Sequence, residues 1–129
     1  LLTHYFQTGE VDMAYVHPYI AEGFGEDFVP ANYDMSVIDH FEQVADKEGA
    51  LMTRRLAKEE GLFCGYSAGS CFQGLLQLKD RLKPTDVVVC IFHDHGSRYV
   101  GKVYIDQQPL YLKALLTTVW FINCIFDLQ

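Results

Sequence analysis

Positive charge is scarce in this chain. Lysine and arginine number 10 against 17 aspartates and glutamates, and the formal net charge is −7. The basic residues are scattered, and Arg54 and Arg55 are the only adjacent pair. Proteins that bind a phosphate backbone gather such residues into a patch or stripe. The sequence therefore argues against a nucleic-acid partner.

Cysteine motifs are also missing. The four cysteines form no C-x-x-C pair, and Cys64, Cys71 and Cys90 each lie inside an apolar segment. This pattern indicates buried thiols in a reducing compartment rather than a disulfide framework or a zinc site. The first residues lack the basic region and apolar run of a signal peptide. We therefore expect a cytoplasmic protein.

The length of 129 residues suits one domain and is short for two. Half of the residues are apolar and 14% are aromatic, so the chain can bury a core. We expect a folded domain rather than a disordered chain.

Residues 61–82 have the pattern of a strand, a tight turn and a helix. A short apolar run, Leu62 to Cys64, enters a corner of small residues, and apolar residues then recur at helical spacing up to Leu82. Ser67 lies at this corner. The first backbone N–H groups of a helix have no partner within the helix, so a ligand can bind there.

Three roles for Ser67 are compatible with this corner. Residues 65–69 (GYSAG) match the G-x-S-x-G nucleophile elbow of serine hydrolases. A serine on such a turn also faces the pyridine nitrogen of pyridoxal phosphate (PLP) in enzymes of fold type II. The third role is structural, with Ser67 capping the helix.

The surrounding segments predict an α/β fold. Residues 46–61 favour a helix, with Asp46 as its N-cap and Gly61 as its C-terminal stop. Residues 87–92 (VVVCIF) form a continuous apolar run, typical of a strand covered on both faces. Residues 37–44 slightly favour a strand. The order helix, strand, helix, strand predicts a parallel sheet with flanking helices.

Ligands of parallel sheets bind beyond the carboxyl ends of the strands. The Ser67 corner and residues 93–97 (HDHGS) each follow a predicted strand, so we expect them at the same end of the sheet. Residues 22–30 contain two glycines, Gly23 and Gly25, which allow close approach of the backbone. This segment is either an ordinary glycine turn or part of a ligand site.

The segment 110–126 is strongly apolar. It is at the lower edge of the length that crosses a membrane, which is roughly 20 residues. We expect a buried helix or strand here, and no membrane partner. A tail produced by an altered reading frame is the alternative.

Four blocks of sequence carry a resemblance to a known family. In order, they are GEDFVP, DHFEQV, ALMTRRLAKEEGLFCGYSAGS and VVVCIFHDHGSRYVGK. They resemble the second half of the catalytic domain of bacterial cystathionine β-synthase and of the related O-acetylserine sulfhydrylases, or cysteine synthases. The resemblance runs from about Tyr5 to Asp106. It implies a partial fold type II PLP-enzyme domain at residues 1–106, followed by a divergent apolar tail at 107–129.

The resemblance also implies a PLP cofactor, a small amino-acid substrate such as serine or O-acetylserine, and a homodimer as one assembly. Ser67 is expected to hydrogen-bond the ring nitrogen of PLP. Because a neutral hydroxyl does not hold a proton on that nitrogen, the cofactor is a weaker electron sink, which favours β-elimination and β-replacement over transamination. The implied site residues are Ser67, Gly65 and Asp94 at the cofactor, and Gly23, Gly25 and Glu26 on the substrate side.

The chain departs from the family in what it lacks. In the family, the lysine bonded to PLP, the asparagine at the ring hydroxyl and the glycine-threonine loop at the phosphate all precede these blocks. Phe24 also stands where isoleucine is usual. We therefore expect neither tight PLP binding nor catalysis by this chain alone. Its lysines all lie within or after the matching blocks: Lys47, Lys58, Lys79, Lys83, Lys102 and Lys113.

Three other interpretations stay open. A serine hydrolase would pair Ser67 with a later acid, Asp80 or Asp86, and with His93 or His95. A metal site would use the His93-Asp94-His95 segment, joined by His40. A non-catalytic remnant would pair with another chain through its apolar tail and an exposed sheet edge.

Overall fold

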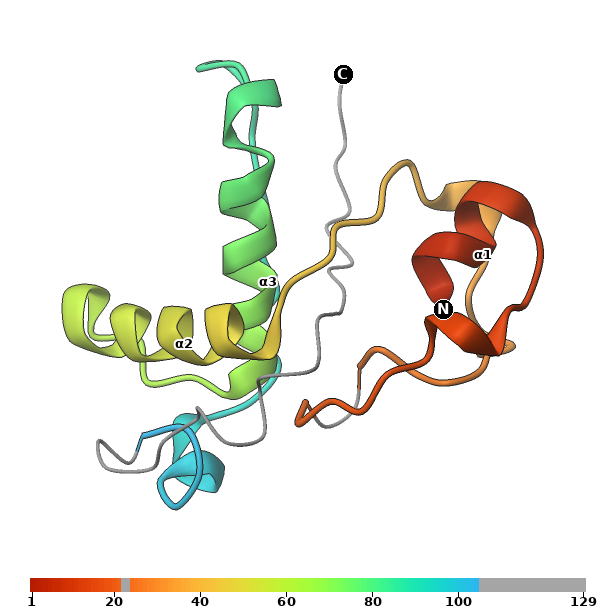
Figure 1. Cartoon of the computed structure of the whole chain (residues 1–129). Coiled ribbons are helices and arrows are strands. Elements are labelled where there is room, and N and C mark those ends of the chain that lie inside the picture. The colour runs from red at the N-terminus through yellow and green to blue at the C-terminus, as the bar shows by residue number, and fades with distance from the viewer. Residues whose placement is uncertain (22–23, 105–129) are drawn as a thin grey trace.

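The computed structural model describes residues 1–21 and 24–104 (Figure 1). Its α-helices are α1 (Leu2–Thr8), α2 (Asp46–Glu60) and α3 (Tyr66–Gln77). Single turns of 3-10 helix occur at Met13–Tyr15, Met35–Val37, Lys79–Arg81 and Gly96–Tyr99. The helix α1 lies on one side of the molecule, and α2 and α3 lie together on the other (Figure 1). The expected tail at 107–129 lies outside the described residues.

The boundaries of α2 follow the local sequence. The predicted helix over residues 46–61 is confirmed, and Gly61 ends it with φ +70°, a left-handed conformation that glycine adopts without strain. The predicted N-cap is wrong, because Ala45 holds that position and Asp46 is the first helical residue. Glu48 supports this end, since its carboxylate accepts a hydrogen bond from the Ala45 N–H at 3.3 Å.

The two long helices cross at glycines. A Cβ added to Gly69 would lie 2.5 Å from the backbone nitrogen of Thr53 and 2.6 Å from the carbonyl oxygen of Gly49. A Cβ on Gly49 would lie 2.2 Å from the Ser70 hydroxyl. The buried Thr53 hydroxyl donates to the Gly49 carbonyl at 2.8 Å beside the same contact. Only residues without side chains let the two backbones approach this closely.

The predicted strands do not form within the described residues, and an antiparallel bridge between Cys64 and His95 is the β-pairing found there. Residues 87–92 are extended but not covered on both faces, because Val87 is 80% and Val89 63% exposed. A parallel strand is stabilised by neighbouring strands, and the described residues supply none beside this segment. The structure therefore leaves the predicted parallel sheet unconfirmed.

Residues 37–44 also differ from the prediction of a strand. Val37 closes a turn of 3-10 helix that Asp34 caps, with the Asp34 carboxylate accepting from the Ser36 N–H at 3.0 Å. The following residues run as an extended connection to α2 (Figure 1). Phe41 in this connection is buried against Leu1 and Leu2, and its ring lies 4.7 Å from that of Phe6. This connection thus packs against α1 in a small apolar cluster.

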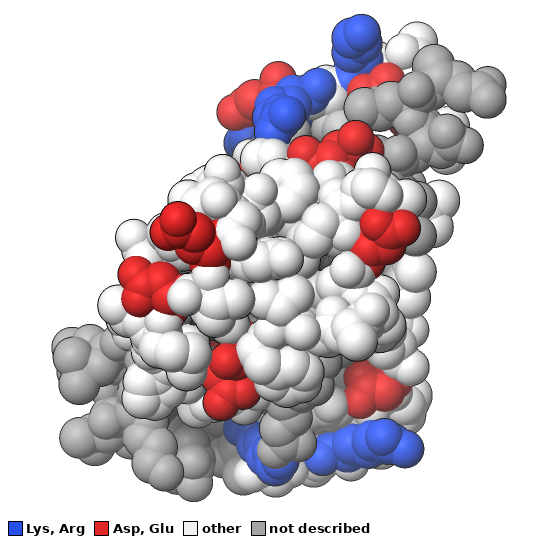
Figure 2. All heavy atoms as spheres, turned by 90° about the vertical axis from the view of Figure 1, so that its right-hand side faces the viewer, with Lys and Arg blue, Asp and Glu red and all other residues white. Residues whose placement is uncertain are grey.

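Charged side chains are dispersed on the face drawn in Figure 2. Aspartates and glutamates are spread singly over it, and lysines and arginines lie towards its two ends. This face carries no continuous basic surface. In the part of the chain that the structure describes, no helix has the length and apolarity to cross a membrane.

The glycine contact between α2 and α3 can be tested by adding one methyl group. In an ordinary helix, Gly→Ala is stabilising by roughly 0.5–1 kcal/mol. We expect Gly69→Ala to lower the free energy of unfolding by about 1–3 kcal/mol, because its Cβ meets backbone atoms that cannot move aside.

Gly101→Ala is the matched control, because a Cβ there meets no atom within 4 Å. It should change the free energy of unfolding by less than about 0.5 kcal/mol. Urea unfolding followed by circular dichroism measures both. A Gly69→Ala variant more stable than the parent chain would contradict the close crossing.

Candidate functional site

The corner at the start of α3 is joined to the segment that follows residues 87–92. The Gly65 N–H donates to the Asp94 carbonyl at 2.9 Å, and the Gly96 N–H donates to the Phe63 carbonyl at 3.0 Å. These two bonds flank the bridge between Cys64 and His95. The structure therefore brings the Ser67 corner and residues 93–97 together, as the sequence predicts, but through an antiparallel contact.

Gly65 is required here by the Asp94 side chain. A Cβ on Gly65 would lie 1.7 Å from Asp94 Oδ1 and 2.9 Å from Tyr99 Cε2. The Tyr99 hydroxyl donates to Asp94 Oδ2 at 2.7 Å and so fixes the carboxylate. Asp94 Oδ1 is buried without a hydrogen-bond partner among the described residues. A buried acceptor of this kind is costly unless a donor reaches it, and it marks a place where a ligand could bind.

Ser67 is the second residue of α3, and its side chain is partly exposed. The interpretation of Ser67 as the helix cap is wrong. Gly65 holds the N-cap position, and no side chain caps this end of α3. The Ser67 side chain is thus placed on the first turn of a helix, where the helix dipole and backbone N–H groups favour electron-rich groups.

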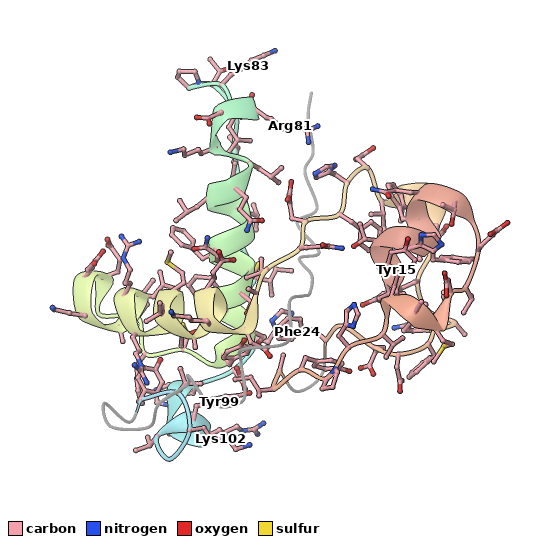
Figure 3. The ribbon with its side chains drawn as sticks, in the orientation of Figure 1. Tyr15, Phe24, Arg81, Lys83, Tyr99 and Lys102 are labelled. Atoms are coloured by element: carbon pink, nitrogen blue, oxygen red, sulfur yellow. The ribbon has the colours of Figure 1, made fainter. Side chains whose placement is uncertain are left out.

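The loop that contains Phe24 and Gly25 reaches the same corner. The Phe24 ring stacks on that of Tyr66, with centroids 5.9 Å apart and planes at 27°. In Figure 3, Phe24 lies where the first turns of α2 and α3 come together. Gly25 is buried with φ +74°, a conformation that disfavours residues with side chains. Gly23 lies outside the described residues.

Glu26, which the resemblance puts on the substrate side, is partly buried. Burial and then the Glu26 charge raise the pKa of Tyr33. The pKa of Tyr19 is raised by burial and then by the charges of Glu26, Asp27 and Asp46. The charge of Glu26 thus acts on two tyrosines, Tyr19 and Tyr33.

Asp46 was predicted only as a helix cap, and the sequence did not reveal its role at the corner. It is 2% exposed, and its Oδ2 accepts from the Ile20 N–H at 2.8 Å. The hydroxyl of Tyr66 lies 2.9 Å from Asp46 Oδ1 and 2.7 Å from its carbonyl oxygen, and it donates its single proton to one of them at a time. Asp46 thus connects the loop before Phe24, α2 and α3. An acid at a helix start is common, so its place in the sequence does not signal this role.

Tyr66 is held in its neutral form. Burial, then the nearby Asp46 charge, and then the hydrogen bond it donates to Asp46 raise the pKa of Tyr66 well above its ordinary value. Tyr104 behaves in the same way, because burial raises its pKa to about 12 while its hydroxyl donates to the Cys64 carbonyl at 2.6 Å. Both hydroxyls serve as donors that stabilise the corner.

The hydrolase interpretation does not match this geometry. A nucleophile elbow puts the serine on a strained turn ahead of the helix, whereas Ser67 lies inside α3. Nδ1 of His95 lies 3.0 Å from the Ser97 hydroxyl, and His93 is exposed.

The metal interpretation finds no support within the described part of the chain. No group of three or more histidine, cysteine, aspartate and glutamate side chains there is arranged to hold a metal ion. His40 lies away from the corner, with its Nε2 2.7 Å from Glu42 and 3.2 Å from Arg81.

Comparison with known proteins identifies the family of the chain. The sequence profile of the pyridoxal-phosphate dependent enzymes matches residues 1–94. The chain belongs to this PLP-dependent family. It is 40% identical to a cysteine synthase of Helicobacter pylori over 85 residues, which are 66% of this chain and 28% of that protein.

Cystathionine β-synthases are further relatives. The chain is 39% identical to the one of Dictyostelium discoideum over 84 residues, 65% of this chain and 17% of that protein. It is 34% identical to the one of Oryctolagus cuniculus over 101 residues, 78% of this chain and 18% of that protein. The chain thus spans less than a third of the length of these relatives.

A solved structure supports the PLP-enzyme fold. It is a lysine-to-alanine mutant of O-ureido-L-serine synthase with O-ureido-L-serine bound, which matches with a TM-score of 0.68 and 28% identity. The match covers 83% of this chain and 32% of that protein. The fold class predicted from the resemblance is thereby confirmed as far as the PLP-enzyme fold.

The contact between Asp46 and Tyr66 predicts a loss of stability in Tyr66→Phe. Removing the hydroxyl takes away the donor that buried Asp46 uses there, so the free energy of unfolding should fall by about 1–3 kcal/mol. Tyr15→Phe is the control, because Tyr15 is 47% exposed. Equal effects of the two substitutions on urea unfolding would contradict this role.

The raised pKa values predict a loss of stability in alkali. As the pH rises above about 10, tyrosines of the unfolded chain release their protons while Tyr66 and Tyr104 keep theirs in the folded chain. The unfolded state then binds fewer protons, so stability falls as the pH rises. Urea unfolding between about pH 8 and pH 11 should show a shallower fall in Tyr66→Phe. An identical pH dependence in both chains would contradict the assignment.

Proposed function

We propose that this chain supplies the ring-nitrogen contact and the substrate loop of a PLP-dependent enzyme of cysteine metabolism. The reaction would be β-elimination or β-replacement on serine or O-acetylserine. The lysine and the phosphate contacts would come from polypeptide outside these 129 residues. The observation that carries the proposal is Ser67 on the first turn of α3, in a chain whose residues 1–94 match the family.

The residues at the corner fit the ring end of PLP. The Ser67 side chain is partly exposed and makes no cap contact to α3. Asp94 Oδ1, packed above Gly65, is a buried acceptor that still lacks a donor among the described residues. The loop at Phe24 and Gly25 reaches this corner through the contact of Phe24 with Tyr66. A ligand with a polar ring and an adjoining amino acid would contact Ser67, Asp94 and this loop.

Each of these residues would have a simple task. Ser67 would donate a hydrogen bond to the ring nitrogen, and a hydroxyl, with its high pKa, would leave no proton there. Asp94, fixed by Tyr99, would accept a hydrogen bond beside the ring. Gly25 would let the loop backbone approach the substrate. When bound, PLP supplies the electron sink for chemistry at the substrate's α-carbon, and a neutral ring nitrogen weakens that sink.

The positions of the described lysines support the proposal that the lysine bonded to PLP lies outside these residues. Lys47, Lys58, Lys79, Lys83 and Lys102 are all exposed. In Figure 3, Lys83 lies beyond the far end of α3 from the corner. A lysine that bonds covalently to a cofactor belongs in an enclosed site.

The exposed apolar edge has the same explanation. We infer that residues 62–64 and 87–92 become strands of a parallel sheet when the rest of such an enzyme is present. Alternation along the second segment supports this, since Val87, Val89 and Ile91 are exposed while residues 88, 90 and 92 are partly buried. Helices packed on that face of the completed sheet would cover the first set.

The first test asks whether the chain alone binds PLP covalently. We expect mixing with PLP and borohydride, followed by peptide mass spectrometry, to give only sparse labelling spread over the exposed lysines. A single lysine labelled to completion would contradict the proposal. A Lys102→Arg variant is a useful control, because Lys102 lies in the turn that follows Tyr99.

The second test restores the missing parts. In a chimera, the matching portion of the Helicobacter pylori cysteine synthase is replaced by residues 1–94 of this chain. Ser67→Ala should lower the rate of cysteine formation from O-acetylserine and sulfide roughly fivefold to tenfold, the worth of one hydrogen bond. Ser36→Ala is the control, because Ser36 is exposed in the N-terminal segment. Equal rates in both variants would remove Ser67 from the site.

A further inference from the structure

Two thiols from different segments lie close together, one on α3 and one in the segment before Asp94. Cys71 Sγ lies 3.1 Å from Cys90 Sγ, and neither residue is in a disulfide. Cys71 is on the buried face of α3, and Cys90 is in the extended segment that leads to Asp94. A disulfide has its sulfurs about 2.05 Å apart, so the pair needs a shift of roughly 1 Å to close.

The two cysteines differ in their exposure to solvent. Cys71 is 5% exposed and packs with Val44, which is 2% exposed. Cys90 is partly buried against the same cluster, between the exposed residues Val89 and Ile91. A reagent from solution therefore reaches Cys90 before Cys71.

We propose that Cys71 and Cys90 are a redox-active dithiol, oxidised by a low-molecular-weight disulfide of the glutathione class. The Cys90 thiolate attacks one sulfur of that disulfide, forming a mixed disulfide and releasing one small thiolate. The Cys71 thiolate then attacks Cys90 Sγ, forming the internal S–S bond and releasing the second small thiolate. The two cysteine protons end on the two small thiols, so two cysteines lose two electrons and one small disulfide gains them.

A disulfide between Cys71 and Cys90 would restrain the segments that carry Ser67 and Asp94 without contacting either residue. Cys71 follows Ser67 by one helical turn, and Cys90 precedes Asp94 by four residues. Joining them fixes the segment before Asp94 against α3, one helical turn from Ser67 and four residues from Asp94. The proposal is independent of PLP binding, since it depends only on the placement of two thiols.

The remaining cysteines are poorer partners. Cys64 packs in a different cluster, with Met52, Leu56 and Ala68, and burial raises the pKa of its thiol. Cys124 lies outside the described residues. We therefore expect selective pairing of Cys71 with Cys90.

The test exposes the reduced 129-residue chain to mixtures of reduced and oxidised glutathione, followed by acid quenching, alkylation and mass spectrometry. The parent chain should lose the mass of two hydrogen atoms and show a cross-link between residues 59–79 and the peptide with Cys90. Since trypsin leaves Cys64 and Cys71 in one peptide, variants decide between them. Cys64→Ala should still form the cross-link, whereas Cys71→Ala should stop at the mixed glutathione disulfide on Cys90.

A second readout excludes random pairing. The same oxidation in concentrated urea should spread the cross-links over several cysteine pairs, while the folded chain should give the pair 71–90 in at least several-fold excess. Amide hydrogen exchange of residues 87–92 should slow after oxidation. Cross-linking through Cys64, equal pairing in folded and unfolded chains, or thiols that stay reduced at high oxidised glutathione would each overturn the proposal.

Discussion

The buried carboxylate of Asp46 is the interaction on which the corner depends. It accepts from the Ile20 backbone on one side and from the Tyr66 hydroxyl on the other. A buried anion is costly unless it is hydrogen-bonded, and here both oxygens are used at the start of a helix, where the dipole favours negative charge. Three segments far apart in the sequence are thereby held at one point. The position of the glycine loop relative to Ser67 follows from this.

Small residues complete the arrangement. Gly49 and Gly69 let α2 and α3 approach, and Gly65 leaves the space that the Asp94 carboxylate occupies. The site is therefore built from backbone proximity and a few polar side chains on the first turn of one helix. We propose that such a site holds the ring of PLP, and the described residues supply no enclosed lysine to bond it. That combination is the reason for assigning the chain a partial role in a PLP-dependent enzyme.

The sequence predicted features that depend on residues close together in the chain. The limits of α2 were predictable because Gly61 and the polar residues near Ala45 act within one turn of the helix. The proximity of residues 93–97 to the corner followed from chain order, whereas α3 begins at Tyr66, inside the corner that was predicted to precede it. The strands were not predictable, since residues 87–92 need neighbours that the described residues do not provide. The role of Asp46 at the corner was missed because its partners, Ile20 and Tyr66, are distant in sequence.

The central claim is that the Ser67 hydroxyl meets an unprotonated ring nitrogen of PLP. Nitrogen-15 NMR of the chimera carrying PLP labelled at the ring nitrogen tests it most directly. The account predicts the chemical shift of a neutral, hydrogen-bonded pyridine, moving towards that of a pyridine without a hydrogen bond in the Ser67→Ala chimera. The shift of a protonated pyridinium, or a shift unaffected by the substitution, would contradict it.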